Sequence, residues 1–200
     1  TVLVNRTSDA IDAPSIACDD HAGIGLVVRH LAQLGHTAIA HVTGPQDISN
    51  GLIRRQAFVA WMHGEGLGSP PELVIETSGF HVEDGQKACE KLLATGADFT
   101  AIVAANDLIA LGCYDTLAKH GIDVPGDVSV TGFDDMAFID RVSPPLTTVR
   151  VPFYEMGALA GTAILSLLSA PENGPDRLPT STRLRPQLKV RGSTGPAADA

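Results

Sequence analysis

The chain has 200 residues, 44% of them hydrophobic, which is enough to fill the core of one good-sized domain or of two small lobes. Charged residues make up 18% and aromatic residues 4%, a balance typical of a soluble globular α/β protein. The formal net charge is −9 and the 14 basic residues are scattered, whereas a duplex-binding surface needs clustered basic side chains. Either the function is not nucleic-acid binding, or a DNA-binding part lies outside this polypeptide.

The cysteines, Cys18, Cys89 and Cys113, are odd in number and far apart, and each lies in or beside an apolar run. This pattern predicts buried free thiols and a reducing, cytoplasmic compartment. The chain shows neither a basic, apolar leader nor a continuous apolar run of about 18 residues, so we expect no signal peptide and no membrane span.

Short runs rich in β-branched residues alternate with longer stretches of helical period. In chain order, we expect strand 1–5, strand 14–18, helix 21–34, strand 38–43, helix 50–64, strand 73–76, helix 82–95, strand 100–105, helix 107–120, strand 128–133, a short segment 147–149, helix 153–168, and strands 177–184 and 187–190. Asn50 is a candidate N-cap for helix 50–64. Repeated strand–helix–strand units with near-continuous apolar strands predict an α/β fold, a doubly wound parallel sheet with helices on both faces.

The longest apolar stripe lies on helix 153–168, where hydrophobic residues recur at helical spacing. Its members are Phe153, Met156, Gly157, Ala160, Ala163, Ile164, Leu167 and Leu168. We expect this face to pack in a core.

Polar residues gather just after three of the expected strands. They are Asn50, Arg54, Asn106, Asp107, Asp134 and Asp135. Ligands of doubly wound proteins bind outside the carboxyl ends of the strands, so these junctions are the expected binding edge.

At these junctions the sequence resembles the LacI/GalR family of bacterial transcription regulators over essentially its whole length. The ordered motifs are Asp19-Asp20 with Gly23, His30-Leu31, Leu34-Gly35-His36, Gly44-Pro45 with Arg54 and Phe58, Ala105-Asn106-Asp107 with Ala110 and Gly112, Gly121-Ile122 with Val124-Pro125 and Asp127 to Val130, Gly132-Phe133-Asp134-Asp135, Pro144 to Val149, and Leu184 with Arg191, Ser193 and Thr194. Two positions depart from the family pattern: Ala57 replaces a usual glycine, and Thr37 a common basic residue.

The resemblance implies a type I periplasmic-binding-protein-like fold with an effector in the cleft between two lobes. Residues 1–18 and 152–184 would form part of an N-terminal lobe, and residues 19–151 and 185–191 a nearly complete C-terminal lobe. Residues 192–200, rich in small side chains, read as a flexible tail. The family's helix-turn-helix headpiece and most of its N-terminal lobe would precede the first residue, so we expect an N-terminally truncated member.

Arg54, Asp134 and Asn106 are the first candidates for ligand contact. The Arg54 guanidinium offers a fixed fork of donors, the Asp134 carboxylate accepts hydrogen bonds from hydroxyl or N–H groups, and the Asn106 amide does both. Asn106 has an alternative role as a helix cap. Phe80 matches an aromatic position of the family and would stack on a ring, with core packing as the alternative.

Arg6, Asn50 and Phe153 also match pocket positions of the family, although Phe153 fits the core stripe of its helix as well. No metal is expected: the histidines lack a spacing such as HExxH, and Asp134-Asp135-x4-Asp140 lacks the calcium-loop pattern. No nucleophile elbow, P-loop or complete GxGxxG is present, so we expect neither catalysis nor a cofactor.

These observations favour the effector-binding and dimerisation region of a LacI/GalR-type repressor. The effector would be a small molecule, with a sugar favoured over a purine or sugar phosphate. Expected partners are that effector, a second copy in a homodimer, and operator DNA only through a headpiece outside the chain; no membrane partner is expected. The alternatives are a periplasmic sugar-binding protein of a transporter and an enzyme on the same fold.

Overall fold

The structure is a computed structural model that describes residues 1–8, 10, 11, 13–169 and 181–197. Its strands are β1 (Leu3–Val4), β2 (Ser15–Cys18), β3 (Ile39–Thr43), β4 (Val74–Glu76), β5 (Ala101–Ala104), β6 (Ser129–Asp134), β7 (Thr147–Arg150), β8 (Thr182–Leu184) and β9 (Gln187–Lys189). Its helices are α1 (Asp20–Gln33), α2 (Ser49–Gly64), α3 (Val82–Ala94), α4 (Asp107–Lys119) and α5 (Phe153–Ser169), with a 3-10 helix, η1 (Pro71–Leu73). Each expected element has an observed counterpart whose ends agree within two residues, except that residues 177–180 of the expected strand 177–184 lie outside the described residues.

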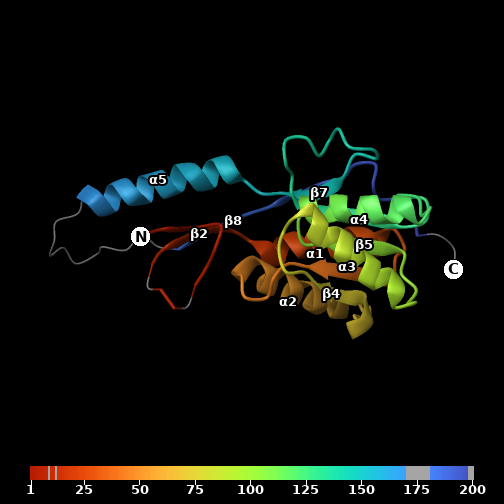
Figure 1. The fold of residues 1–200 in the computed structure, drawn as a ribbon. Coiled ribbons are helices and arrows are strands. Elements are labelled where there is room, and N and C mark those ends of the chain that lie inside the picture. Colours follow the sequence, from red (N-terminus) through yellow and green to blue (C-terminus); the bar gives the residue numbers. More distant parts are fainter. Residues whose placement is uncertain (9, 12, 170–180, 198–200) are drawn as a thin grey trace.

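The larger sheet has the strand order β4-β3-β5-β6-β7-β9. Its neighbouring strands are parallel except for the antiparallel pair β7 and β9. Helices α1 and α2 cover one face and α3 and α4 the other (Figure 1). The predicted α/β fold with a doubly wound, mainly parallel sheet is therefore confirmed.

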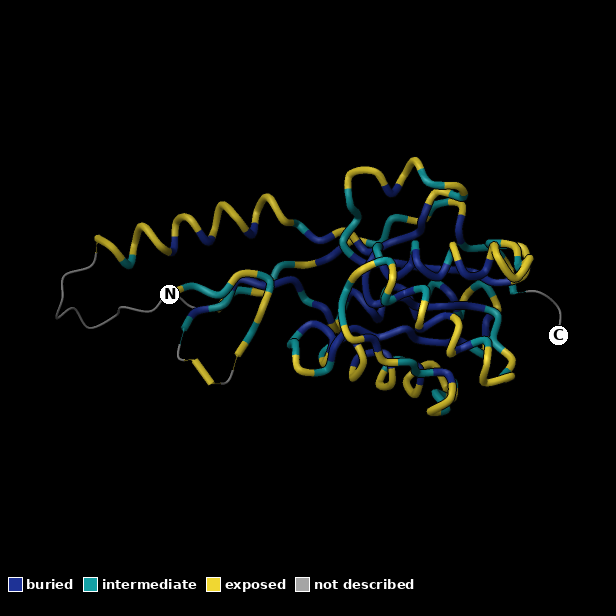
Figure 2. Tube along the Cα trace, in the orientation of Figure 1, coloured by how far each residue is buried: buried dark blue, intermediate teal, exposed yellow. Residues whose placement is uncertain are grey.

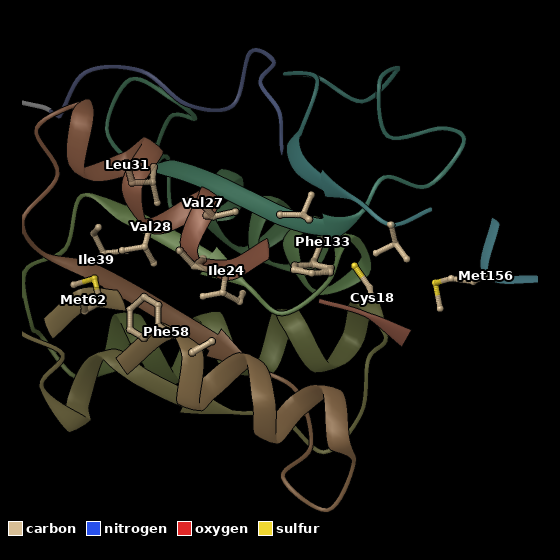
Figure 3. Close-up of a cluster of buried hydrophobic side chains, with 14 of the residues drawn as sticks. Cys18, Ile24, Val27, Val28, Leu31, Ile39, Phe58, Met62, Phe133 and Met156 are labelled. Carbon is tan, nitrogen blue, oxygen red and sulfur yellow. The ribbon is translucent and has the colours of Figure 1, made fainter. Parts of the chain in front are cut away.

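A separate hydrophobic cluster fills each face of this sheet, because successive side chains along a strand point to opposite faces. Ile39 of β3 belongs to the cluster under α1 and α2, whereas its neighbour Ala40 belongs to the cluster under α3 and α4. Figure 3 shows the first cluster, in which Ile24, Phe58 and Phe133 are fully buried. Cys18 and Met156 extend this cluster toward the smaller sheet.

The smaller sheet has the order β1-β2-β8 and is parallel. Helix α5 packs against it through Met156, Ala160 and Ala163 and extends from the body of the molecule (Figure 1). The expected core packing is wrong for other members of the stripe: Phe153 is 48% exposed, Ile164 is 45% exposed and Leu168 is 78% exposed. The small sheet covers only one side of the helix, and most other residues of α5 are exposed (Figure 2).

The smaller sheet takes its strands from residues 1–18 and 152–184, and the larger sheet from 19–151 and 185–191. The assignment of these segments to two lobes stays a prediction. Among the described residues, no helix is both long and apolar enough to cross a membrane.

The expectation of a flexible tail is wrong for residues 192–197. Ser193 is fully buried; its carbonyl accepts from Val130 N–H at 2.9 Å and its Oγ accepts from Thr147 N–H at 2.8 Å. Further along, Ala197 N–H donates to the Leu34 carbonyl at 2.9 Å. The small side chains that suggest mobility instead let this backbone lie close against the sheet. Residues 198–200 lie outside the described residues.

Helices α3 and α4 contact each other at two glycines, Gly85 and Gly112. A Cβ atom at Gly112 would lie 2.1 Å from the Val82 carbonyl oxygen and 2.6 Å from the Gln86 nitrogen. Both are backbone atoms, so the helices would have to move apart to admit even a methyl group.

We predict that Gly112→Ala lowers the free energy of unfolding by about 1–3 kcal/mol or more, the usual cost of overpacking. The matched control is Gly64→Ala at the end of α2, where a Cβ would meet nothing within 4 Å. That variant should be neutral or up to about 1 kcal/mol more stable, because alanine has the higher helix propensity. Urea unfolding measures both. Equal stabilities would contradict the close contact between α3 and α4.

Candidate functional site

A cavity of about 130 Å³ lies where the carboxyl ends of the two sheets face each other. Its lining residues are Asn5, Arg6, Asn50, Arg54, Phe80, Asn106 and Asp134. Asn5 and Arg6 follow β1 of the smaller sheet, and the others come from segments that follow β3, β4 and β5 or from the end of β6. Strands β3 and β5 are neighbours whose following helices, α2 and α4, cover opposite faces, so the cavity lies at a topological switch point.

The structure brings together Arg6, Asn50, Arg54, Phe80, Asn106 and Asp134 from the predicted set. It does not bring Phe153 to them: this residue begins α5, is half exposed and does not line the cavity. That these residues bind a ligand stays a prediction.

Arg54 is 2% exposed and is held on several sides. Its Nε and Nη2 atoms each lie 2.8 Å from Oδ1 of Asp20, and its Nη1 donates to the Ala105 carbonyl. Its guanidinium also lies over the Phe133 ring, 3.7 Å from the centroid, a cation–π contact. Arg54 is therefore fixed in one orientation.

Asp20 is a site residue that the sequence analysis did not single out. Its side chain is 5% exposed and pairs with Arg54. A signal was present in the Asp19-Asp20 pair at a helix start. One aspartate suffices as the cap, and Asp19 takes this role by accepting from Ala22 N–H at 3.0 Å. The second is then available for a buried cation.

Asn50 does not cap α2 as expected. The helix begins at Ser49, and its N-cap position is Ile48, which makes no side-chain cap. The Asn50 amide instead donates to Asp20 Oδ2 at 3.2 Å, and its Oδ1 accepts from Arg6 Nη1 at 2.7 Å. The Asn50 side chain therefore bonds to two charged residues instead of capping the helix N-terminus. Its bond with Arg6 links the larger sheet to the smaller one across the cavity.

Asp134 ends β6 with an unusual backbone angle, φ +116°. Its Oδ1 lies 3.7 Å from Arg54 Nη2, beyond hydrogen-bond reach, so its oxygens keep acceptor capacity toward the cavity. Burial raises the pKa of Asp134 to about 6, although the Arg54 charge acts in the opposite direction.

Asn106 both caps a helix and lines the cavity. Its Oδ1 accepts from Ile109 N–H at 2.8 Å at the start of α4, so the capping alternative is confirmed. Its amide donates to the Phe80 carbonyl at 3.2 Å, which leaves one amide hydrogen for another acceptor. The Phe80 ring packs so closely on Gly44 that a Cβ there would lie 2.3 Å from it.

Asn5 is the second site residue that the sequence analysis did not single out. Its backbone is left-handed, with φ +54°, and within the described part of the chain its buried Oδ1 has no hydrogen-bond partner. Asparagine tolerates this conformation better than most residues. An asparagine at the last position of the first expected strand was the available signal.

Asp107 bonds to the segment that follows Asp134 and to β7. It is fully buried; its Oδ2 accepts from Met136 N–H at 2.8 Å and its Oδ1 from the Thr148 hydroxyl. Burial raises the pKa of Asp107 to about 7, and the two hydrogen bonds oppose that rise.

The described residues contain no group of three or more histidine, cysteine or acidic side chains that could hold a metal ion. Cys18, Cys89 and Cys113 are free and buried. Burial raises the pKa of Cys18 to about 12, so its thiol stays protonated and unreactive at neutral pH.

Comparison with known proteins shows which family the chain belongs to. Residues 28–194 match the family described as periplasmic binding protein-like domain. The chain is 34% identical to a LacI transcriptional regulator from a Rhodococcus species. The match covers 100% of this chain and 71% of that structure, with a TM-score of 0.86. The chain belongs to the LacI/GalR family of transcriptional regulators and has its periplasmic-binding-protein-like fold, as the motifs predict.

Two further relatives are informative. The regulator MalR of Streptomyces coelicolor is 40% identical over an alignment of 201 positions, which covers 98% of this chain and 56% of MalR. The complex of the transcriptional regulator CelR with cellobiose has a TM-score of 0.89 at 28% identity, over 96% of this chain and 58% of that one. The chain thus spans about half the length of the curated relatives it matches.

The raised pKa of Asp107 predicts a pH dependence of stability. Between about pH 4 and pH 7 the folded chain keeps a proton on Asp107 that the unfolded chain has lost, so this group makes stability fall as pH rises. His41 acts oppositely: burial lowers its pKa to about 4, so it makes stability rise with pH up to its ordinary value of 6.5. The difference in stability between the unmodified chain and Asp107→Asn separates the contribution of Asp107 from that of His41.

We predict that Asp107→Asn loses less stability than the unmodified chain as pH rises from about 4 to about 7. Above pH 7 the difference between the two should become constant, because the aspartate is ionised in both folded and unfolded states. Urea unfolding at pH 4.5, 5.5, 6.5 and 7.5 measures it. Parallel stability curves would show that Asp107 titrates alike in both states.

Proposed function

We propose that this chain is the effector-binding and dimerisation region of a LacI/GalR-type repressor. It binds a small neutral sugar in the cavity between the two sheets and thereby controls operator binding by the longer protein. The observation that carries this proposal is a cavity that receives polar side chains from the carboxyl ends of both sheets. Its lining includes Arg6, Asn50, Arg54, Phe80, Asn106 and Asp134.

The charges around the cavity favour a neutral ligand. The cations Arg6 and Arg54 are balanced by Asp20 and Asp134, so neither a phosphate nor an ammonium group would find an excess of opposite charge. Asp134 offers acceptor oxygens for hydroxyl groups, and Phe80 offers an apolar ring for the C–H face of a sugar. Among the relatives, the CelR structure holds cellobiose and a LacI-family regulator from Enterococcus faecium holds ribose.

Control of DNA binding follows from contacts on both sides of the cavity. A ligand that bonds Arg6 near the smaller sheet and Asp134 on the larger one prefers the arrangement in which both reach it. It shifts the equilibrium between arrangements only by its difference in affinity for them. The operator would be bound by a headpiece outside this chain, in a homodimer whose symmetry matches a two-fold operator, in the cytoplasm.

A transporter's sugar-binding protein, the alternative on the same fold, gains no support, because the relatives described above are regulators.

We predict that isothermal titration at pH 7.5 detects binding of a neutral sugar from a panel of cellobiose, maltose, D-galactose and D-ribose. Asp134→Asn should weaken that binding by about 10- to 100-fold, the value of a hydrogen bond to a charged group. The matched control is Asp140→Asn, which removes the same charge from an exposed position outside the cavity lining.

Two results would contradict the proposal. One is binding of adenine or glucose 6-phosphate with no binding of any neutral sugar. The other is a sugar affinity that is the same in Asp134→Asn as in the unmodified chain. Operator control is tested separately, by gel shift of the longer protein with and without the sugar.

A further inference from the structure

Asp135, the neighbour of the cavity residue Asp134, holds two arginines. Its Oδ1 lies 2.6 Å from Arg191 Nη2 and its Oδ2 lies 2.5 Å from Arg150 Nε. The Asp135 side chain is 4% exposed, so this is a buried carboxylate rather than a solvated surface pair. No part of the cavity lining includes Asp135, Arg150 or Arg191.

The two arginines lie near opposite ends of β7, the strand beside β6. Arg150 is the last residue of β7, directly before the chain passes to α5. Arg191 follows β9, which the chain reaches on its return from β8, and its Nη1 donates to the Leu146 carbonyl at 2.8 Å. Figure 1 shows the chain running from β7 to α5 in the other part of the molecule.

The backbone at Asp134 and Asp135 needs such a support. Both residues have positive φ, +116° and +59°, which non-glycine residues rarely adopt unless their surroundings hold them there. Asp135 is held by Arg150 and Arg191, and the next residue, Met136, donates its N–H to Asp107. Three elements thus fix the segment that directs the Asp134 carboxylate into the cavity.

We propose that Asp135 is a positioning residue for ligand binding: paired with Arg150 and Arg191, it holds the Asp134 carboxylate in the cavity and ties it to the end of β7, from which the chain passes to α5. This inference rests on the proposed function for its consequence, since a ligand on Asp134 would act on the connection from β7 to α5 through the ion pair between Asp135 and Arg150. The holding of Asp134 itself requires no ligand and can be measured without one.

The test uses Arg150→Gln, a change at a half-exposed side chain that removes one of the two partners of Asp135. The readout is the titration of the Asp134 carboxyl carbon by NMR. Loss of a nearby cation alone would raise the pKa of Asp134. Release of Asp134 toward solvent would lower its pKa from about 6 toward the ordinary 3.8, so the direction separates repositioning from simple electrostatics.

We expect the pKa of Asp134 to fall in Arg150→Gln and to stay the same in Asp140→Asn. Asp135→Asn is read by affinity, because loss of its negative charge would itself lower the pKa of Asp134. Cellobiose affinity by isothermal titration, where the unmodified chain binds it, should fall at least tenfold in Arg150→Gln and Asp135→Asn and stay the same in Asp140→Asn. If Asp135→Asn does not fold, Arg150→Gln decides the matter.

An unchanged or raised pKa of Asp134 in Arg150→Gln would overturn the positioning role, even if that variant unfolds more easily. If no sugar binds the unmodified chain but the pKa of Asp134 still falls, the proposed function fails while the positioning role stands. The two ideas are therefore separable.

Discussion

The ion pair between Arg54 and Asp20 is the constraint around which the carboxyl edge of the larger sheet is built. Both side chains are almost completely buried, 3% and 5% exposed. Burying a charge without a partner is costly, so each residue is acceptable in this position only because the other is there. Asn50, Ala105 and Phe133 add a hydrogen bond to the carboxylate, an acceptor and a ring face. A cation from α2 and an anion from α1 thereby fix the position of both helices.

The ion pair between Arg54 and Asp20 determines both the charge balance of the cavity and its link to the smaller sheet. Arg54 faces Asp134 at 3.7 Å without binding it tightly, so the Asp134 carboxylate stays available. Asn50, held by Asp20, accepts from Arg6 and so connects the larger sheet to the smaller one. The site is consequently electrically balanced and spans two parts of the chain. A ligand bound there would contact both, as the proposed sensing function requires.

Periodicity and turn residues were sufficient to predict the elements and the doubly wound sheet, and the ordered motifs predicted the family. The same motifs placed Arg54, Asn106 and Asp134 at one edge, where the structure brings them together. Asp20 and Asn5 were missed because their roles depend on partners distant in sequence. The outward faces of Phe153 and Leu168 were missed because an apolar stripe does not reveal how much surface is available to cover it. The ordered segment 192–197 was missed because its small polar residues form bonds with distant backbone groups.

A double-mutant cycle on Asp20→Asn and Arg54→Gln tests most directly whether the two residues act as one unit. Each single variant leaves a buried charge unpaired and should lose about 3–5 kcal/mol of unfolding free energy. The double variant should lose less than the sum of the two, by about 1–3 kcal/mol, because neither charge remains. Single losses within about 0.5 kcal/mol that simply add would contradict the account, since changes at independent surface sites behave in this way.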